Sequence, residues 1–306
     1  MESESVMAYR LKAKESVPHG LRRIVREELK DAIRQLSKNS NRDEAIHEAR
    51  KSIKKVRAAL KLVRRELGST YHQENSRLRD AAHMLSVLRD AGAMITTFDA
   101  VRDHDKKHGK GRSEKNMRRI LVTRKAQVER EHNLEQLLPR VSESVADARD
   151  LSSGWPPRRG GFTAMEKDFE KTFRDGRKAM AKLQKDRRPE LFHELRKRVK
   201  DHWYHVRLLE NLWDEMMIGY EKTLKDLESR LGDDHNLVLL HDLVAAEPER
   251  YGKPSDIRSL YDKIASYQKE VRREALDLAK RIYSERPRKL VKRFRALWTV
   301  WHKSHS

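Results

Sequence analysis

The sequence predicts an all-α protein made of two helical halves. Three observations lead to this prediction. Helix-forming residues dominate the 306-residue chain, which contains only 12 glycines and 8 prolines. Apolar residues recur at steps of three and four, which is the spacing of an amphipathic helix. Finally, a stretch of the first half reappears in the second half, so the chain contains an internal repeat.

The first half is expected to contain four helices. One apolar stripe runs from Leu21 to Leu36, and the clearest one runs from Ile46 to Leu67, where Gly68 ends it. A third helix is expected over about 71–104 and a fourth from about 113 to 138, with a pattern that allows its continuation to 150.

A segment rich in serine, proline and glycine marks the middle of the chain and predicts a linker. The expected helices after it cover about 162–185, 189–217, 218–246 and 255–283. We therefore divide the chain into a first helical bundle over 1–150, a linker over 151–161, a second bundle over 162–285 and a basic amphipathic tail helix over 286–306.

The internal repeat is gapless. A shift of 146 positions aligns residues 46–98 with residues 192–244. Five identities fall within eight positions, which chance rarely produces, so the repeat indicates a duplication. These identities are His47 with His193, Glu48 with Glu194, Arg50 with Arg196, Lys51 with Lys197 and Lys54 with Lys200.

The net charge of +21 points to a polyanionic partner, because neutralisation by such a partner relieves the self-repulsion of the protein. Nucleic acid, an anionic membrane and an inorganic polyanion all remain candidates on charge alone. The chain has no cysteine, which excludes disulfides, thiolate catalysis and cysteine-bound zinc. It also has no secretory signal pattern and no apolar run of roughly 20 residues, so we expect a cytosolic protein.

Cations at steps of three and four line one face of each repeated helix. A solvated helix face needs positive charge only loosely, yet both copies carry the same cations in the same phase, each led by a histidine. The repetition favours an anion site, with capping or packing as the alternative role of the histidines. The first copy contributes His47, Arg50, Lys54, Arg57, Lys61 and Arg64, and the second contributes His193, Arg196, Lys200 and Arg207, with Trp203 in the place of Arg57.

These segments resemble a known family. His47–Arg57 and Phe192–Lys200 are similar to the histidine-led signatures of the CHAD family, the conserved histidine α-helical domains. Phe173–Lys178 looks like the basic motif of that family on the preceding helix. Leu85–Asp90 and Leu231–Asn236 resemble its later motifs. The resemblance covers about residues 18–285, with the motifs in order.

The resemblance implies two pseudo-symmetric antiparallel four-helix bundles around a central basic groove that binds inorganic polyphosphate without catalysis. It also makes association with polyphosphate granules an expectation. The second copy departs from the family pattern at three positions, so we expect the two copies to contact the ligand unequally. Asp201 aligns with Lys55, Trp203 aligns with Arg57, and Asn236 stands in place of an aspartate. The implied polyphosphate-binding residues are His47, Arg50, Lys51, Lys54, Arg57, Lys61, Arg89, Arg174, Arg177, His193, Arg196, Lys197, Lys200 and Arg207.

Two other functions remain open. Nucleic-acid binding would use the same charge, but aromatic residues make up only 6% of the chain and are not interleaved with the basic stripes. A polyphosphate-processing enzyme would need metal-binding carboxylates, and no such pair is evident. Lys51 and Lys197 stand where a zinc-protease helix has its second histidine. We therefore expect no catalytic residue, metal or cofactor.

The sequence contains three further patterns that indicate a function only weakly. His104 and His108 are four residues apart but enter a glycine-containing loop, so they are a poor metal pair. Gly109–Gly111 lacks the rest of a P-loop. The tail carries an apolar face from Leu290 to Trp301 and suits either a membrane-surface helix or, as we prefer, a helix that packs on the second bundle.

Overall fold

The computed structural model describes residues 9–38, 40–104, 112–155 and 160–305. Within these ranges the chain forms 13 α-helices and no β-strand, which confirms the predicted all-α class. Three short 3-10 helices join them, namely η1 (Ser152–Gly154), η2 (Phe162–Ala164) and η3 (Glu210–Leu212).

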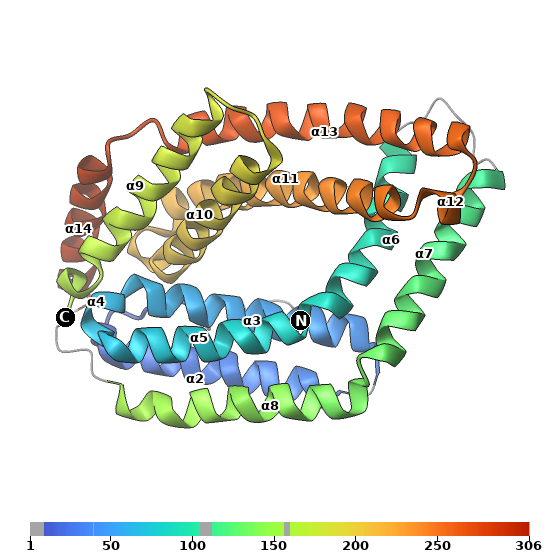
Figure 1. Cartoon of the computed structure of the whole chain (residues 1–306). Helices are drawn as coiled ribbons and strands as arrows, with labels where there is room; N and C mark the ends of the chain where they lie inside the picture. Colours follow the sequence, from blue (N-terminus) through green and yellow to red (C-terminus); the bar gives the residue numbers. More distant parts are fainter. Residues whose placement is uncertain (1–8, 39, 105–111, 156–159, 306) are drawn as a thin grey trace.

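Four helices of the first half lie side by side (Figure 1). α2 packs against α3 and α8, and α5 closes the bundle against α3 and α8. Apolar side chains at helical spacing point inward, so Ile24, Ile53 and Val145 are fully buried. The bundle consists of α2 (Val17–Leu36), α3 (Arg42–Leu62), α5 (Ser69–Met84) and α8 (Leu134–Leu151), with the short α4 (Arg64–Leu67) after α3.

In the second half, α10 packs between α9 and α11, and α11 packs on α13. The tail forms α14 (Pro287–Lys303), which packs on α9 and buries Phe294, Trp298 and Trp301, so its apolar face covers the second half. The other helices are α9 (Glu166–Leu183), α10 (Pro189–Leu208), α11 (Asp214–Ala246), α12 (Pro248–Tyr251) and α13 (Pro254–Ile282).

Four of the expected helices are broken. The 189–217 helix is interrupted between Leu208 and Asp214 by η3, so that its end belongs to α11. The 46–67 helix ends at Val63, where α4 begins, and the 71–104 helix divides at Leu85 into α5 and α6 (Ser86–His104). The fourth helix divides at Asn133, whose φ of 40° lies in the left-handed region, into α7 (Arg112–Glu131) and α8. These breaks let α6 and α7 leave the first bundle and pack on α11, α12 and α13 (Figure 1). There they form a second core around Phe98, Leu121, Leu240 and Ile264.

The two halves share the main core rather than each closing its own. His205 of α10 donates from Nε2 to the Ala58 carbonyl of α3 at 2.9 Å. Arg64 Nε pairs with buried Asp168 Oδ1 of α9 at 2.7 Å. The predicted linker is packed at its start, because Trp155 is buried and its carbonyl accepts from Arg22, whereas 156–159 lie outside the described residues.

A segment before α2 ties the halves together and is called here the N-terminal strap (Tyr9–Leu11). Leu11 N donates to the Leu208 carbonyl at 3.0 Å, and Arg10 pairs with Glu210 at 2.7 Å. Tyr9 is fully buried and donates from its hydroxyl to the Lys55 carbonyl at 2.8 Å. The strap therefore contacts both α3 and the end of α10.

Candidate functional site

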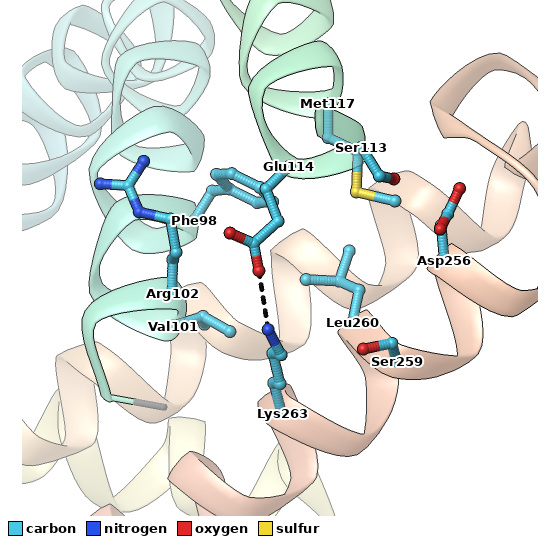
Figure 2. A pocket seen from close by; sticks show the side chains of 10 residues that line it. All are labelled: Phe98, Val101, Arg102, Ser113, Glu114, Met117, Asp256, Ser259, Leu260 and Lys263. Carbon is cyan, nitrogen blue, oxygen red and sulfur yellow. Dashed lines mark hydrogen bonds and ion pairs between the residues drawn. The ribbon is translucent and has the colours of Figure 1, made fainter. Parts of the chain in front are cut away.

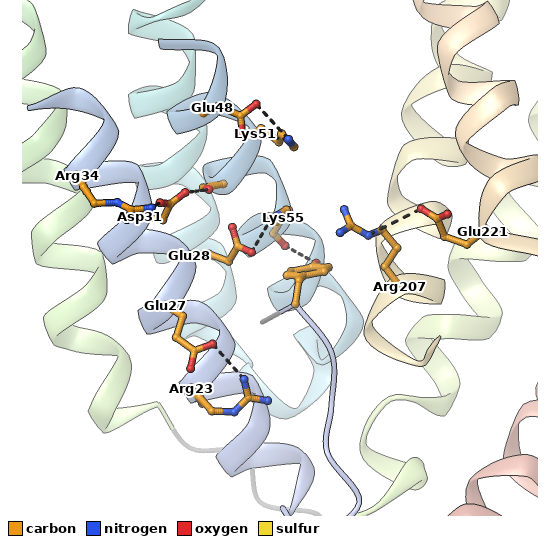
Figure 3. A network of polar contacts seen from close by, with 12 residues as sticks. Arg23, Glu27, Glu28, Asp31, Arg34, Glu48, Lys51, Lys55, Arg207 and Glu221 are labelled. Carbon is orange, nitrogen blue, oxygen red and sulfur yellow. Dashed lines mark hydrogen bonds and ion pairs between the residues drawn. The ribbon is translucent and has the colours of Figure 1, made fainter. Parts of the chain in front are cut away.

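Neighbouring lysines on α3 have opposite surroundings. Lys55 is buried and pairs with Glu28 of α2, with Nζ and Oε1 2.7 Å apart (Figure 3). Lys54 is half-buried on the other face, and it has no hydrogen-bond or ion-pair partner among the described residues. Lys55 is thus neutralised within the first bundle, whereas the charge of Lys54 remains uncompensated.

Arg50 and Lys54 of α3 lie near Arg196 and Lys200 of α10, and these four residues are called here the central cation cluster. Burial, followed by the charges of Lys200, Arg50 and Arg196, lowers the pKa of Lys54 to about 6. Burial also lowers the pKa of Arg50, which the charges of Arg89 and Arg196 lower further, and it lowers the pKa of Lys200. Four partly desolvated basic groups therefore lie close together, and an anion between them would relieve the repulsion that lowers the pKa of Lys54.

Three side-chain contacts recur in both copies at the same 146-residue offset. In each copy, residues on the basic helix contact residues at matching positions on the next long helix, α5 and α6 in the first half and α11 in the second. The duplication is thus visible in contacts as well as in sequence, although the two-fold relation of whole bundles stays a prediction. Arg89 Nε donates to His47 Nδ1 at 3.1 Å, and at the matching positions the rings of His235 and His193 lie 4.4 Å apart. Arg50 donates to the Ala82 carbonyl, and Arg196 correspondingly pairs with Glu228 at 3.4 Å. Arg57 Nε donates to Asn75 Oδ1 at 3.0 Å, and Trp203 Nε1 correspondingly donates to Glu221 Oε1 at 2.6 Å.

The leading histidines flank the cluster as neutral rings. Burial and the charge of Arg89 lower the pKa of His47, while burial and the charges of Lys197 and Arg196 lower the pKa of His193. The side chain of His47 is 45% exposed, so it is not a core histidine. Because its Nδ1 accepts from Arg89, its proton lies on Nε2, which can donate to a ligand.

Among the other predicted residues of α3 and α10, Lys51, Lys61 and Arg207 have partners of their own. Lys51 pairs with Glu48 at 3.0 Å, Lys61 pairs with Asp201 across the two halves, and Lys197 is exposed. Arg207 lies over the rings of Tyr9 and Trp203 and is 3.9 Å from Glu221 (Figure 3).

Arg174 and Arg177 of α9 are not brought to the cluster by any contact of the described residues. Arg174 pairs with Glu170 at 3.2 Å, and Arg177 donates to the Glu285 carbonyl at 2.6 Å. Although burial opposes the shift, a hydrogen bond from Lys171 lowers the pKa of the neighbouring Asp175, and the charge of Arg198 lowers it further. Arg198 lies on the face of α10 opposite to Arg196 and Lys200. Both arginines therefore serve contacts of α9, and their role in binding stays a prediction.

Two residues at the site were missed by the sequence analysis, namely Glu228 and His235. Glu228 pairs with Lys200 at 2.9 Å and with Arg196 at 3.4 Å. Burial and the charges of Arg196, His193 and Lys197 lower the pKa of His235 to about 4. The repeat held a signal for both, because the offset aligns His235 with Arg89 and Glu228 with Ala82.

A pocket between α6, α7 and α13 has a different character (Figure 2). Phe98, Met117 and Leu260 form an apolar wall, and Glu114 pairs with Lys263 at 2.7 Å. Opposite charges balance there, so this pocket is not an anion site.

Signals for a metal site are also weak. No group of three or more metal-ligating side chains occurs in the described part of the chain. His104 stacks on Tyr267 with ring centroids 4.5 Å apart, whereas His108 and Gly109–Gly111 lie outside the described residues.

The comparisons with known proteins fit this architecture. A search of curated proteins finds no match. Two solved structures share the fold, namely PptA from Streptomyces chartreusis (TM-score 0.63, 13% identity, 89% of this chain and 100% of that chain) and the CHAD domain from the plant Ricinus communis (TM-score 0.62, 14% identity, 90% and 94%). None of the described helices is long and apolar enough to cross a membrane. The family model of the CHAD domain matches residues 23–245, which is most of the chain, and the protein therefore belongs to the CHAD family.

Proposed function

We propose that the protein binds inorganic polyphosphate at the central cation cluster and does not catalyse its turnover. The observation that carries the proposal is the convergence of four cations from two helices, with Lys54 lacking an ion-pair partner among the described residues. A polyphosphate chain carries closely spaced negative charges that several cations can contact together. Arginine supplies bidentate donors for phosphate, and lysine supplies a mobile charge.

The surroundings of the cluster support polyphosphate over nucleic acid. Proteins that hold single strands without sequence preference stack bases on exposed aromatic rings. α3 has no phenylalanine, tryptophan or tyrosine, and the Phe192, Trp203 and Tyr204 rings of α10 are all buried. Trp203 also stacks on Tyr204, with ring centroids 4.9 Å apart. Charge and donors are therefore present without a stacking platform.

The carboxylates near the cluster support binding without catalysis. Two-metal phosphate hydrolysis uses several carboxylates that converge on the metal ions. Glu228, which contacts the cluster, instead pairs with Lys200 and Arg196.

A competition experiment tests the proposal. The protein is saturated with labelled long-chain polyphosphate and titrated with unlabelled polyphosphate or duplex DNA at fixed salt. We expect polyphosphate to displace the label at far lower phosphate concentration than DNA does. Equal displacement would favour a nucleic-acid-binding protein, and release of orthophosphate during incubation would refute the absence of catalysis.

A further inference from the structure

One carboxylate is built into the central cation cluster. Glu228 Oε1 lies 2.9 Å from Lys200 Nζ and 3.4 Å from Arg196 Nη2. Its side chain is only 14% exposed, which is less than the 22% and 23% of its two partners. Two other carboxylates interact electrostatically with the cluster but form no ion pair with it. Asp90 interacts in this way with Arg50, and Asp233 with Arg196.

This carboxylate is present in only one copy of the internal repeat. Position 228 corresponds to Ala82 in the first copy. Arg50 donates there to a backbone carbonyl, whereas Arg196 meets the carboxylate of Glu228 at the matching place. Both copies thus have an arginine at this position, but only the arginine of the second copy, Arg196, is neutralised by a carboxylate. The asymmetry divides the cluster into an open pair, Arg50 and Lys54, and a closed pair, Arg196 and Lys200.

The charge of Glu228 is secure in the free protein. Although burial alone would raise the pKa of Glu228, the charges of Lys200, Arg196 and Lys54 and a hydrogen bond from Lys200 hold that pKa below its usual value. A phosphate oxygen that approaches Arg196 or Lys200 therefore meets a carboxylate already bound to the same donors. Phosphate and carboxylate must then compete, or the like charges must lie close together.

We infer that Glu228 is an internal counter-anion that a ligand must displace from Lys200 and Arg196, so that it selects long polyphosphate chains against small phosphates. The inference rests on the proposed function. A chain held at Arg50 and Lys54 presents its next phosphates to the closed pair at high effective concentration, so displacement of Glu228 becomes an intramolecular step. Orthophosphate lacks this advantage and gains little by replacing one anion with another.

The test uses Glu228→Gln, which keeps the side-chain shape and an acceptor for Lys200 but removes the charge. Affinities for orthophosphate, tripolyphosphate and long-chain polyphosphate are measured at one salt concentration. We expect E228Q to bind the two short ligands about tenfold more tightly, with a smaller gain for the long chain, so that discrimination falls. Glu274→Gln is the matched control, because Glu274 is an ion-paired carboxylate on α13, 2.7 Å from Arg230, and its loss changes net charge equally.

Two results would overturn the inference. Weaker binding by E228Q would make Glu228 a positioning residue for Arg196 and Lys200. Equal gains for E228Q and E274Q would reduce the effect to net charge.

A measurement without polyphosphate separates this inference from the proposed function. In low-salt chloride, E228Q should unfold at a lower temperature than the wild type, because the cluster has lost its counter-anion. Added sulfate should then raise the unfolding temperature of E228Q more than that of the wild type or of E274Q. If the wild type fails to bind polyphosphate, the proposed function is wrong, while this sulfate response still supports or refutes the counter-anion role.

Discussion

Reversal of Arg50 and Lys54 to glutamate should weaken polyphosphate binding far more than reversal of Lys225 and Lys269. The first pair belongs to the open part of the central cation cluster, where Lys54 has no partner among the described residues and Arg50 donates to the Ala82 carbonyl. Lys225 and Lys269 are exposed on α11 and α13. Both double variants change the net charge equally, so long-range attraction of the ligand is matched to first order.

The magnitude follows from burial. A phosphate contact to a partly desolvated cation contributes about 1.5–3 kcal/mol, so loss of two contacts should cost about 3–6 kcal/mol, or roughly 10²- to 10⁴-fold in affinity. An exposed charge contributes less than about 1 kcal/mol, so the control pair should lose no more than about 30-fold. The free protein should stay folded, because the two reversals remove the repulsion that Arg50 and Lys54 exert on each other and on Arg196 and Lys200.

The assay is a titration of both double variants with one polyphosphate length, accompanied by circular dichroism to confirm equal helicity. Equal losses of affinity in the two variants would mean that binding uses a diffuse positive surface, and the assignment of the central cation cluster as the site would be wrong.

Three further outcomes are expected. Polyphosphate affinity should fall with salt along a log–log slope of about −4 to −7 for roughly six to ten phosphate contacts, and a flat salt titration would exclude the electrostatic mechanism. Binding should take up a proton at neutral pH, because burial and neighbouring cations lower the pKa of Lys54 to about 6 and a polyanion raises it again. Affinity should therefore fall as pH rises above 6, by at most about tenfold per unit, and calorimetry in buffers of different ionisation enthalpy should find an uptake that Lys54→Met removes. Acid should destabilise the fold, because burial lowers the pKa of His202 to about 3 and that of His205 to about 4, so that the unfolded chain binds more protons below about pH 6.5. The free energy of unfolding should fall by up to about 2.7 kcal/mol per pH unit between pH 6 and 4, and denaturant titrations of His205→Gln should show about half that slope.

The helices were predictable because apolar periodicity is a local property of the chain. Their interruptions were not, because the cause lies far away in sequence. Leu85 and Asn133 divide expected helices at the points where α6 and α7 turn to pack on α11, α12 and α13. The internal repeat aligns α11 with the segment that forms α5 and α6, yet α11 runs unbroken for 33 residues. Tertiary packing thus decides where a helical sequence bends.

The cations of the candidate site were predictable from their repetition, but their state of charge compensation was not. Lys54 and Lys55 look alike in the sequence, and only the packing of α2 shows that Glu28 neutralises one of them. Glu228 is not predictable from the residues that the two copies share, because the informative feature at this position is the difference from Ala82.

The N-terminal strap has a consequence for biosynthesis. Arg10 and its partner Glu210 are 200 positions apart, and Leu11 bonds to the Leu208 carbonyl. At about 5–20 residues per second, a ribosome needs roughly 10–40 s to make the partner of a segment that it has already released. During that interval the Arg10 guanidinium and the Leu11 N–H lack the native partners that η3 and α10 later supply. The N-terminal strap therefore reaches its native contacts only after α10 and η3 have been synthesised.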